Sequence, residues 1–136
     1  MIQEQYVSFE TAKLLKEKGF NELCYLGYNK NGEYFPTGNR RNSEIIQPDF
    51  CLLCAPTQQM AMRWLREVHN IYIVVEPHSH NGFKAVEYEI MYWHEGHYHV
   101  PYQESHPTYH PLYGKTWNTY EEACEAAIRY CLEHLI

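Results

Sequence analysis

The sequence predicts an α+β fold in which an antiparallel sheet of about five strands, arranged in hairpins, is covered by three helices. Three segments repeat apolar residues at helical spacing and begin with residues that cap helices. The extended runs between them are broken by dipeptides typical of hairpin turns: Asn31-Gly32, Asn81-Gly82 and Glu95-Gly96. The expected order of elements is α-β-β-α-β-β-β-α. With 136 residues the chain has the length of a single domain, which we place at residues 1–136.

Two helices are expected in the first half of the chain. One lies near residues 8–18, where Ser8 is a suitable N-cap and Gly19 can end the helix in the left-handed conformation. The other lies near 56–69, because the missing N–H of Pro56 would have no partner at the first helical position anyway. The apolar stripe of this second helix comprises Met60, Ala61, Trp64, Leu65 and Val68.

A third helix is expected near residues 120–135. It starts with a capping box, in which the side chains of Thr119 and Glu122 can each accept the backbone N–H of the other residue. Its expected buried face comprises Ala123, Cys124, Ala127, Ile128, Cys131, Leu132 and Leu135. Residues 36–50 and 101–118 are rich in Pro, Gly, Asn and Ser, so we expect long loops or short irregular strands there.

The hairpin turns also predict which residues face each other. If the second and third turn dipeptides are both two-residue loops, the opposed pairs are Ile73 with Ile90, Val75 with Tyr88, Tyr92 with His99 and His94 with His97. Side chains alternate between the two faces of a strand. We therefore expect His94, His97 and His99 on one face, at the end of an apolar stripe, and His78 and His80 on the opposite face.

The three histidines on the first face could hold a metal. Three imidazoles can bind zinc or another divalent transition metal and leave a fourth position open for a water molecule. His94, His97 and His99 would then make the chain a metal-binding protein or a metal-dependent hydrolase. The alternative is the polar end of a core face, where imidazoles bond to tyrosine hydroxyls and loop carbonyls. The sequence has no HExxH motif, and we favour this alternative, with no cofactor.

Residues 92–120 are dense in aromatic side chains: thirteen of these 29 residues are Tyr, Trp or His, and Lys115 is the only lysine or arginine. Such a composition suits a protein–protein contact, in which aromatic residues anchor the interface and charges are depleted. The candidate binding residues are Tyr92, Trp93, Tyr98, Tyr102 and Trp117. Sugar stacking would fit as well, and so would tyrosines that only fill a half-buried sheet.

Charge and cysteine content narrow the remaining function classes. The net charge of −6 argues against binding to nucleic acid or to an anionic membrane, and no apolar run approaches the ~20 residues of a membrane-spanning helix. The five cysteines accompany no secretion signal, so we expect reduced thiols in the cytoplasm. Cys51 and Cys54 have CxxC spacing and could join His78 and His80 around zinc, but a role as small apolar residues is the simpler interpretation.

Three segments carry a resemblance to a known group of proteins. They are SFETAKLLKEKGF, CAPTQQMAMRWLREVHNIYI and TYEEACEAAIRYCLEHLI, and APTQ followed by WLREVHNI is their most distinctive motif. They resemble small uncharacterised proteins encoded by gut bacteria of the Bacteroides type and by their phages and prophages. The resemblance covers about 50 residues, mostly the three helices. It implies a cytoplasmic accessory protein, phage-borne or carried by another mobile element, and it assigns no catalytic residue or cofactor.

The leading hypothesis from the sequence is a non-enzymatic accessory protein that binds another protein or associates with itself. No serine–histidine–acid set, phosphate-binding glycine loop or nucleotide fingerprint is present, so we do not expect an enzyme. The metal-binding protein or hydrolase at the three histidines is the first alternative. A nucleic-acid-associated phage protein is the second.

Overall fold

The computed structural model describes residues 1–45, 53–80, 83–99 and 116–136, without the side chains of residues 78–80, 83, 84, 94, 98 and 99. The elements in these ranges are α1 (Phe9–Glu17), β1 (Cys24–Tyr28), β2 (Tyr34–Arg40), η1 (Asn42–Glu44), β3 (Leu53–Ala55), α2 (Gln58–His69), β4 (Ile71–His80), β5 (Phe83–His94), β6 (His97–His99) and α4 (Tyr120–His134). The α+β class is confirmed, and so is the predicted order. The structure adds β3 and extends β2 to Arg40, into the range 36–50 where the sequence predicted long loops or short irregular strands.

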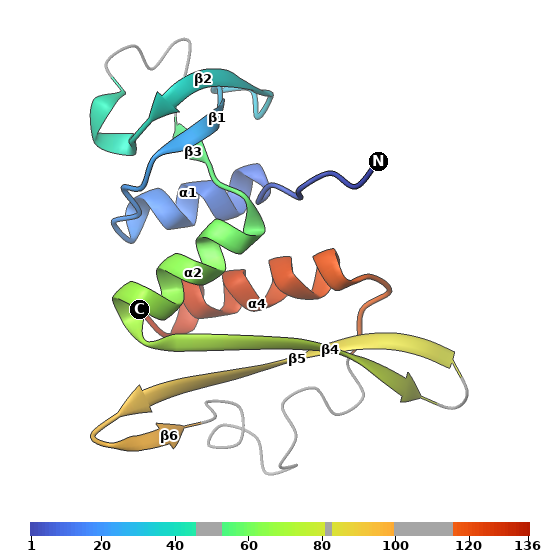
Figure 1. The fold of residues 1–136 in the computed structure, drawn as a ribbon. Helices are drawn as coiled ribbons and strands as arrows, with labels where there is room; N and C mark the ends of the chain where they lie inside the picture. Colours follow the sequence, from blue (N-terminus) through green and yellow to red (C-terminus); the bar gives the residue numbers. More distant parts are fainter. Residues whose placement is uncertain (46–52, 81–82, 100–115) are drawn as a thin grey trace.

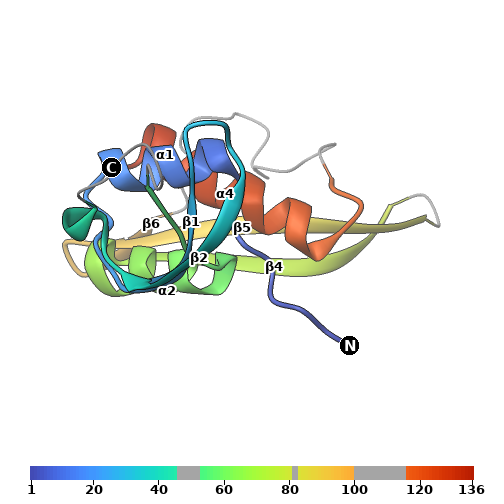
Figure 2. The ribbon, with the colours of Figure 1, turned by 90° about the horizontal axis from the view of Figure 1, so that it is seen from above.

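Within the described ranges the strands form two antiparallel sheets, where the sequence predicted one. The first has the order β2-β1-β3 and the second the order β4-β5-β6. The helices lie between the two sheets, with α1 next to the first sheet and α4 next to the second (Figure 1). The strands of the two sheets run crosswise when seen from above (Figure 2). Hairpin turns indicate only which consecutive strands pair, so they could not show that the short β3 completes a separate sheet beside β1.

The helix starts follow the capping chemistry, with one correction. Ser8 caps α1 and accepts from the N–H of Thr11. Thr57 is the N-cap of α2 and accepts from the N–H of Met60, so the predicted start at Pro56 is wrong. A threonine oxygen satisfies an unpaired N–H of the first turn, whereas proline only lacks one. Two residues of the predicted stripe are also exposed, Met60 by 37% and Val68 by 56%.

The capping of α4 is close to the prediction. The N–H of Glu122 donates to the Thr119 hydroxyl over 3.1 Å, but the Glu122 carboxylate accepts from the N–H of Asn118 rather than of Thr119. Six of the seven predicted core residues of this helix are buried: Ala123, Cys124, Ala127, Ile128, Cys131 and Leu132. Because α4 packs against α1 on one side and β4 and β5 on the other, it is the central element of the core.

The register of the second sheet is the predicted one. Ile73 pairs with Ile90, and Val75 pairs with Tyr88. The short strand β6 pairs His97 with His94, and the backbone turns at Gly96 with a φ of 79°. Within the described residues, no helix is both long and apolar enough to cross a lipid bilayer.

The first hairpin turns at Gly32, as its sequence indicates. Gly32 has a φ of 78°, and a Cβ at this position would lie 3.3 Å from the ring of Phe9. The Asn29 side chain stabilises the turn by accepting from the N–H groups of Asn31 and Glu33. This tight approach of the turn to α1 sets the position of β2 and, with it, of Tyr34 at its start.

Candidate functional site

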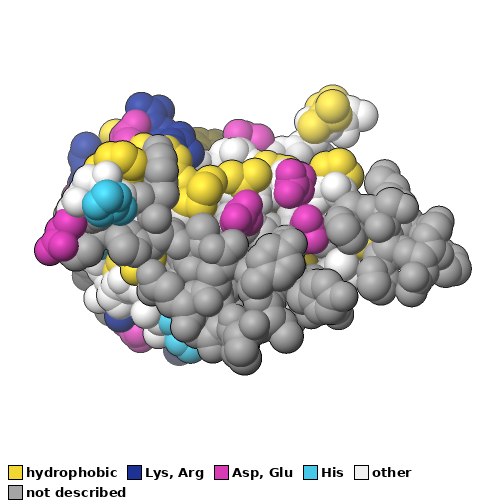
Figure 3. Space-filling view, turned by 90° about the horizontal axis from the view of Figure 1, so that it is seen from below, with side chains coloured by type: hydrophobic (Ala, Val, Ile, Leu, Met, Phe, Trp, Pro, Cys, Tyr) yellow, Lys and Arg dark blue, Asp and Glu magenta, His cyan; other side chains and the backbone are white. Residues whose placement is uncertain are grey.

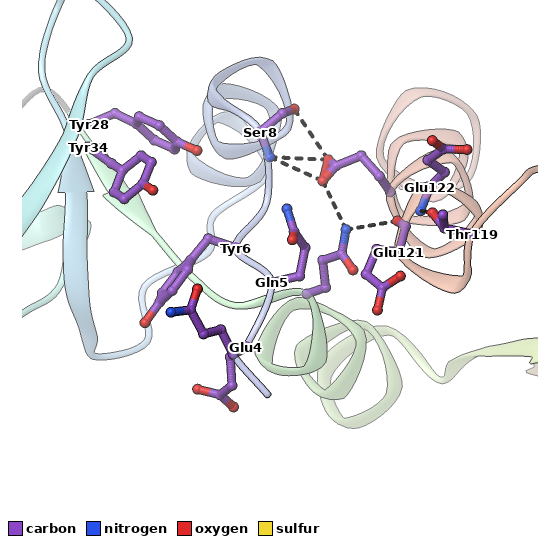
Figure 4. Close-up of a pocket in the computed structure, with 12 residues that line it drawn as sticks. Glu4, Gln5, Tyr6, Ser8, Tyr28, Tyr34, Thr119, Glu121 and Glu122 are labelled. Carbon is purple, nitrogen blue, oxygen red and sulfur yellow. Dashed lines mark hydrogen bonds between the residues drawn. The ribbon is translucent and has the colours of Figure 1, made fainter. Parts of the chain in front are cut away.

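The most distinctive concave feature of the described residues is a hollow of about 630 Å³. It lies where the N-terminal segment, the β1–β2 hairpin and the starts of α2 and α4 meet (Figure 4). We call it the tyrosine–glutamate hollow. Its lining residues are Gln3, Glu4, Gln5, Tyr6, Ser8, Tyr28, Tyr34, Gln58, Thr119, Glu121, Glu122 and Glu125. None of these residues is a lysine or arginine.

Glu125 holds the hollow together. Its carboxylate accepts the N–H of Ser8 over 3.1 Å and the Ser8 hydroxyl over 3.3 Å, across 117 residues of sequence. It also accepts from the side-chain amide of Gln58, which donates to the carbonyl of Glu121 as well. Gln58 is only 3% exposed, so its buried amide needs both acceptors to offset the loss of hydrogen bonds to water. One carboxylate therefore ties the starts of α1 and α2 to α4.

Tyrosines form one wall of the hollow. The rings of Tyr6 and Tyr34 are nearly parallel with centroids 6.5 Å apart, and Tyr28 meets Tyr34 edge-on at 6.0 Å. Tyr28 is buried and donates its hydroxyl to the carbonyl of Val7 over 2.6 Å. Burial raises the pKa of Tyr28, with a further contribution from Glu125, so its hydroxyl remains a donor. Tyr34 is 63% exposed and offers its ring to solvent.

Acidic side chains line the rest of the hollow: Glu121 and Glu122 lie on α4, across from the tyrosines, and Glu4 lies on the N-terminal segment near Tyr6 (Figure 4). Glu125 is occupied by the bonds to Ser8 and Gln58, and Glu122 accepts from Asn118. Glu4 and Glu121 are exposed, and neither carboxylate has a hydrogen-bond or ion-pair partner in the described part of the chain. Two carboxylates thus remain available to a ligand.

The starts of three helices reduce this negative charge but do not cancel it. Ser8 and Thr119 are the N-caps of α1 and α4, and Gln58 is the first residue of α2. Each helix start carries roughly half a positive charge. Against about 1.5 positive charges stand the four glutamates of the lining, so the hollow remains acidic.

Of the five aromatic residues predicted as a binding face, the structure describes the side chains of Tyr92, Trp93 and Trp117. Tyr92 and Trp117 pack against the core, and the Trp117 ring lies 4.8 Å from that of Tyr88. Trp93 is on the opposite sheet face and is 47% exposed. Tyr102 and the side chain of Tyr98 lie outside the described residues. Among the three with described side chains, Trp93 is the exposed one.

The three predicted metal ligands keep their predicted register positions. His97 pairs with His94, and Tyr92 pairs with His99. The side chains of His94 and His99 lie outside the described part of the chain. The metal site therefore stays a prediction from the sequence. In the described residues, no group of three or more His, Cys, Asp or Glu side chains could hold a metal ion.

The described cysteines belong to the core, as predicted. Cys124 and Cys131 are fully buried on α4, and Cys54 is buried in β3. A hydrogen bond between Cys24 and Cys54 raises the pKa of Cys24 and lowers the pKa of Cys54, which sequence reasoning did not anticipate. Cys51, the other half of the CxxC pair, lies outside the described residues.

Sequence reasoning missed the tyrosine–glutamate hollow. The caps at Ser8 and Thr119 were the available signals, since both mark helix starts. Nothing local indicates that Glu125 reaches Ser8 or that Tyr34 joins Tyr6, because these contacts depend on tertiary packing. Comparisons with protein-family models, curated proteins and solved structures found no match to the chain.

Proposed function

We propose that the chain is a binding protein that takes a basic, extended segment of a partner protein into the tyrosine–glutamate hollow. The observation that carries this proposal is one cavity lined by the exposed ring of Tyr34 and by the carboxylates of Glu4 and Glu121, which have no partner within the described residues. It supports the function expected from the sequence, binding to another protein. The proposed site is the hollow and not the aromatic residues of the range 92–120.

The chemistry of the two walls selects a positive charge. Tyrosine ring faces attract arginine and lysine through cation–π contacts, and the carboxylates of Glu4 and Glu121 attract them through charge. An anionic ligand such as a nucleic acid backbone would meet the same carboxylates as repulsion. A neutral ligand would leave their charge uncompensated.

The magnitudes favour a peptide over a single cation. An exposed cation–π contact contributes about 0.5–1 kcal/mol, and an exposed ion pair contributes at most about 1 kcal/mol. One cationic group that meets one ring and two carboxylates therefore gains at most about 3 kcal/mol. A millimolar dissociation constant requires roughly 4 kcal/mol. Useful affinity needs a ligand that reaches both walls, as an extended peptide with two basic side chains does.

The test is a titration with an acetylated, amidated peptide of sequence Gly-Arg-Gly-Arg-Gly. Calorimetry or tyrosine fluorescence should show binding that weakens as salt is added. The same peptide with citrulline in place of arginine has the same shape without charge and should bind at least tenfold more weakly. Equal affinity for the two peptides, or none for either, would refute the proposal.

Variants assign the binding to the hollow. Glu121→Gln and Tyr34→Leu each remove one recognition group at an exposed position, so both should weaken arginine-peptide binding without loss of stability. Glu17→Gln removes the same charge from an exposed position on α1 outside the hollow and serves as the matched control. If Glu17→Gln weakens binding as much as Glu121→Gln does, the attraction is a general effect of net charge.

A metal site at His94, His97 and His99 is the second candidate, favoured by the backbone register of β5 and β6. The register places these three residues at positions of the same sheet face, within one tight hairpin. Elemental analysis of untagged, mildly dialysed protein should then find stoichiometric zinc or another divalent transition metal. A metal-free preparation that also fails to bind added zinc would remove this candidate.

The cellular setting follows from the resemblance of the three helical segments. We infer a cytoplasmic accessory protein of Bacteroides-type bacteria, carried by a phage, prophage or other mobile element. A partner for such a protein would come from the host or from the element itself. Fractionation of a native producer would test the cytoplasmic location.

A further inference from the structure

β4 forms an open edge of the second sheet. The order β4-β5-β6 leaves no strand on its outer side in the described ranges. β4 pairs with β5 without a bulge, so this edge is regular. Proteins usually protect such an edge with lysine, proline, a bulge or a very short strand. From Ile71 to Val75 the strand has none of these; Glu76 is the first charged residue of the strand, and Pro77 follows it.

The backbone hydrogen bonds show which groups of β4 face outward. The N–H of Trp93 donates to the carbonyl of Asn70, and bonded pairs alternate with non-bonded ones along an antiparallel ladder. Val86, opposite Pro77, fits this alternation. Its N–H and C=O both point away from β4 and bond to Trp117, so Pro77 and Val86 form a non-bonded pair. The N–H and C=O groups that point to the open edge are therefore those of Ile71, Ile73 and Val75.

The outer face beside this edge is apolar. Tyr72 and Val74 on β4 are 38% and 37% exposed, and Trp93 on β5 is 47% exposed. The view onto this side of the molecule shows hydrophobic side chains gathered next to a group of acidic ones (Figure 3). An unprotected edge next to an apolar face is the usual surface for addition of a further strand.

We propose that this edge pairs with the same edge of a second copy of the chain. The two β4 strands run antiparallel about a two-fold axis at Val74, so that the sheet continues from one copy into the other. Ile73 and Val75 then exchange backbone bonds with the partner's Val75 and the partner's Ile73. Ile71, which is only 3% exposed, lies at the margin of this pairing.

A second copy fits this edge because the residues are self-complementary. In the proposed register Val74 meets the partner's Val74, and Ile73 meets the partner's Val75, so apolar side chains face each other on both sides of the sheet. Glu76 is the nearest charged residue of β4 and faces the partner's Tyr72, so no two like charges are directly opposed between the two β4 strands. A two-fold axis satisfies both edges with one set of residues. The surface shares no residue with the tyrosine–glutamate hollow, so the two proposals can fail independently.

The first test is the mass in solution, measured by sedimentation or light scattering over a range of concentrations. The wild type should form dimers as concentration rises. Val74→Lys should raise the dimer dissociation constant at least about tenfold, because like charges directly opposite each other repel. Tyr25→Lys introduces the same charge at an exposed position of the first sheet and should leave the dimer unchanged. A wild type that stays monomeric, or equal behaviour of both variants, overturns the proposal.

Single cysteine substitutions test the register of the pairing. A disulfide traps the dimer covalently, so this test also works for a weak dimer. In Val74→Cys the two new thiols face each other as a non-bonded pair, so mild oxidation with diamide should link the copies through a disulfide. Glu89→Cys places a thiol on the same sheet face but on the middle strand, away from the edge. Linking of both variants to the same extent, or only of Glu89→Cys, would overturn the proposed pairing.

Discussion

Replacing Glu125 with alanine tests whether one carboxylate ties the starts of α1 and α2 to α4. The change removes the acceptor of the Ser8 N–H, of the Ser8 hydroxyl and of one Gln58 bond. Hydrogen bonds to charged groups contribute about 1.5–3 kcal/mol when they are well buried. Glu125 is half-buried, so solvent weakens each bond, and we expect a total loss of about 2–3 kcal/mol.

Urea unfolding measures this loss. With a slope of about 2 kcal/mol per molar urea, the middle of the usual range, the midpoint should fall by roughly 1–1.5 M while the slope stays constant. Glu133→Ala is the matched control, because it removes a carboxylate of the same helix whose partners, Arg129 and His134, are both exposed, for a loss of about 0.5 kcal/mol or less. Glu125→Gln keeps one acceptor oxygen and should fall between the two. If Glu125→Ala and Glu133→Ala lie within about 0.5 kcal/mol of each other, the assigned role of Glu125 is wrong.

Three further predictions concern the core. Ile128→Ala should destabilise the fold by about 2–4 kcal/mol in the same urea assay, because it opens a cavity at a fully buried position of α4, whereas Val68→Ala at an exposed position should cost under about 0.5 kcal/mol. Burial lowers the pKa of His69, whose Nε2 has no hydrogen-bond partner in the described residues. As the pH falls, the unfolded chain binds a proton at this histidine before the folded chain does, so stability should fall below about pH 6.5. His69→Gln should flatten that decline in thermal melts from pH 8 to pH 5. A decline as steep as that of the wild type would contradict this. Burial raises the pKa of Cys124 to about 11 and raises that of Cys131 as well, so mass spectrometry should find both thiols unalkylated by iodoacetamide at pH 8 until urea is added.

Much of the fold could be predicted because local chemistry specifies it. The caps at Ser8 and Thr119 mark two helix starts, and the turn at Glu95-Gly96 sets the pairing of His94 with His97. The division into two sheets could not be predicted, because β3 pairs with β1 across a long stretch of chain and has only three residues. Short strands of this kind carry too few residues for a period-2 pattern.

The candidate site was less accessible to sequence reasoning than the fold. Hydrophobic periodicity and turn dipeptides report on neighbours in sequence, whereas the bond between Ser8 and Glu125 joins the two ends of the chain. The density of aromatic residues drew attention to Tyr92 and Trp117, yet both pack against the core. Composition alone does not distinguish an aromatic side chain that is buried in the core from one that is exposed at a binding surface. Burial makes that distinction, and it depends on tertiary structure.

The most direct measurement of the central claim is a map of where a basic peptide binds. Backbone amide shifts of isotope-labelled protein, recorded during titration with the Gly-Arg-Gly-Arg-Gly peptide, locate the contact residue by residue. The hollow predicts that the largest changes fall on Tyr6, Ser8, Tyr34 and Glu121, with little change along β4. Changes concentrated around Trp93, or spread evenly over all acidic residues, would contradict the assignment of the hollow as the binding site.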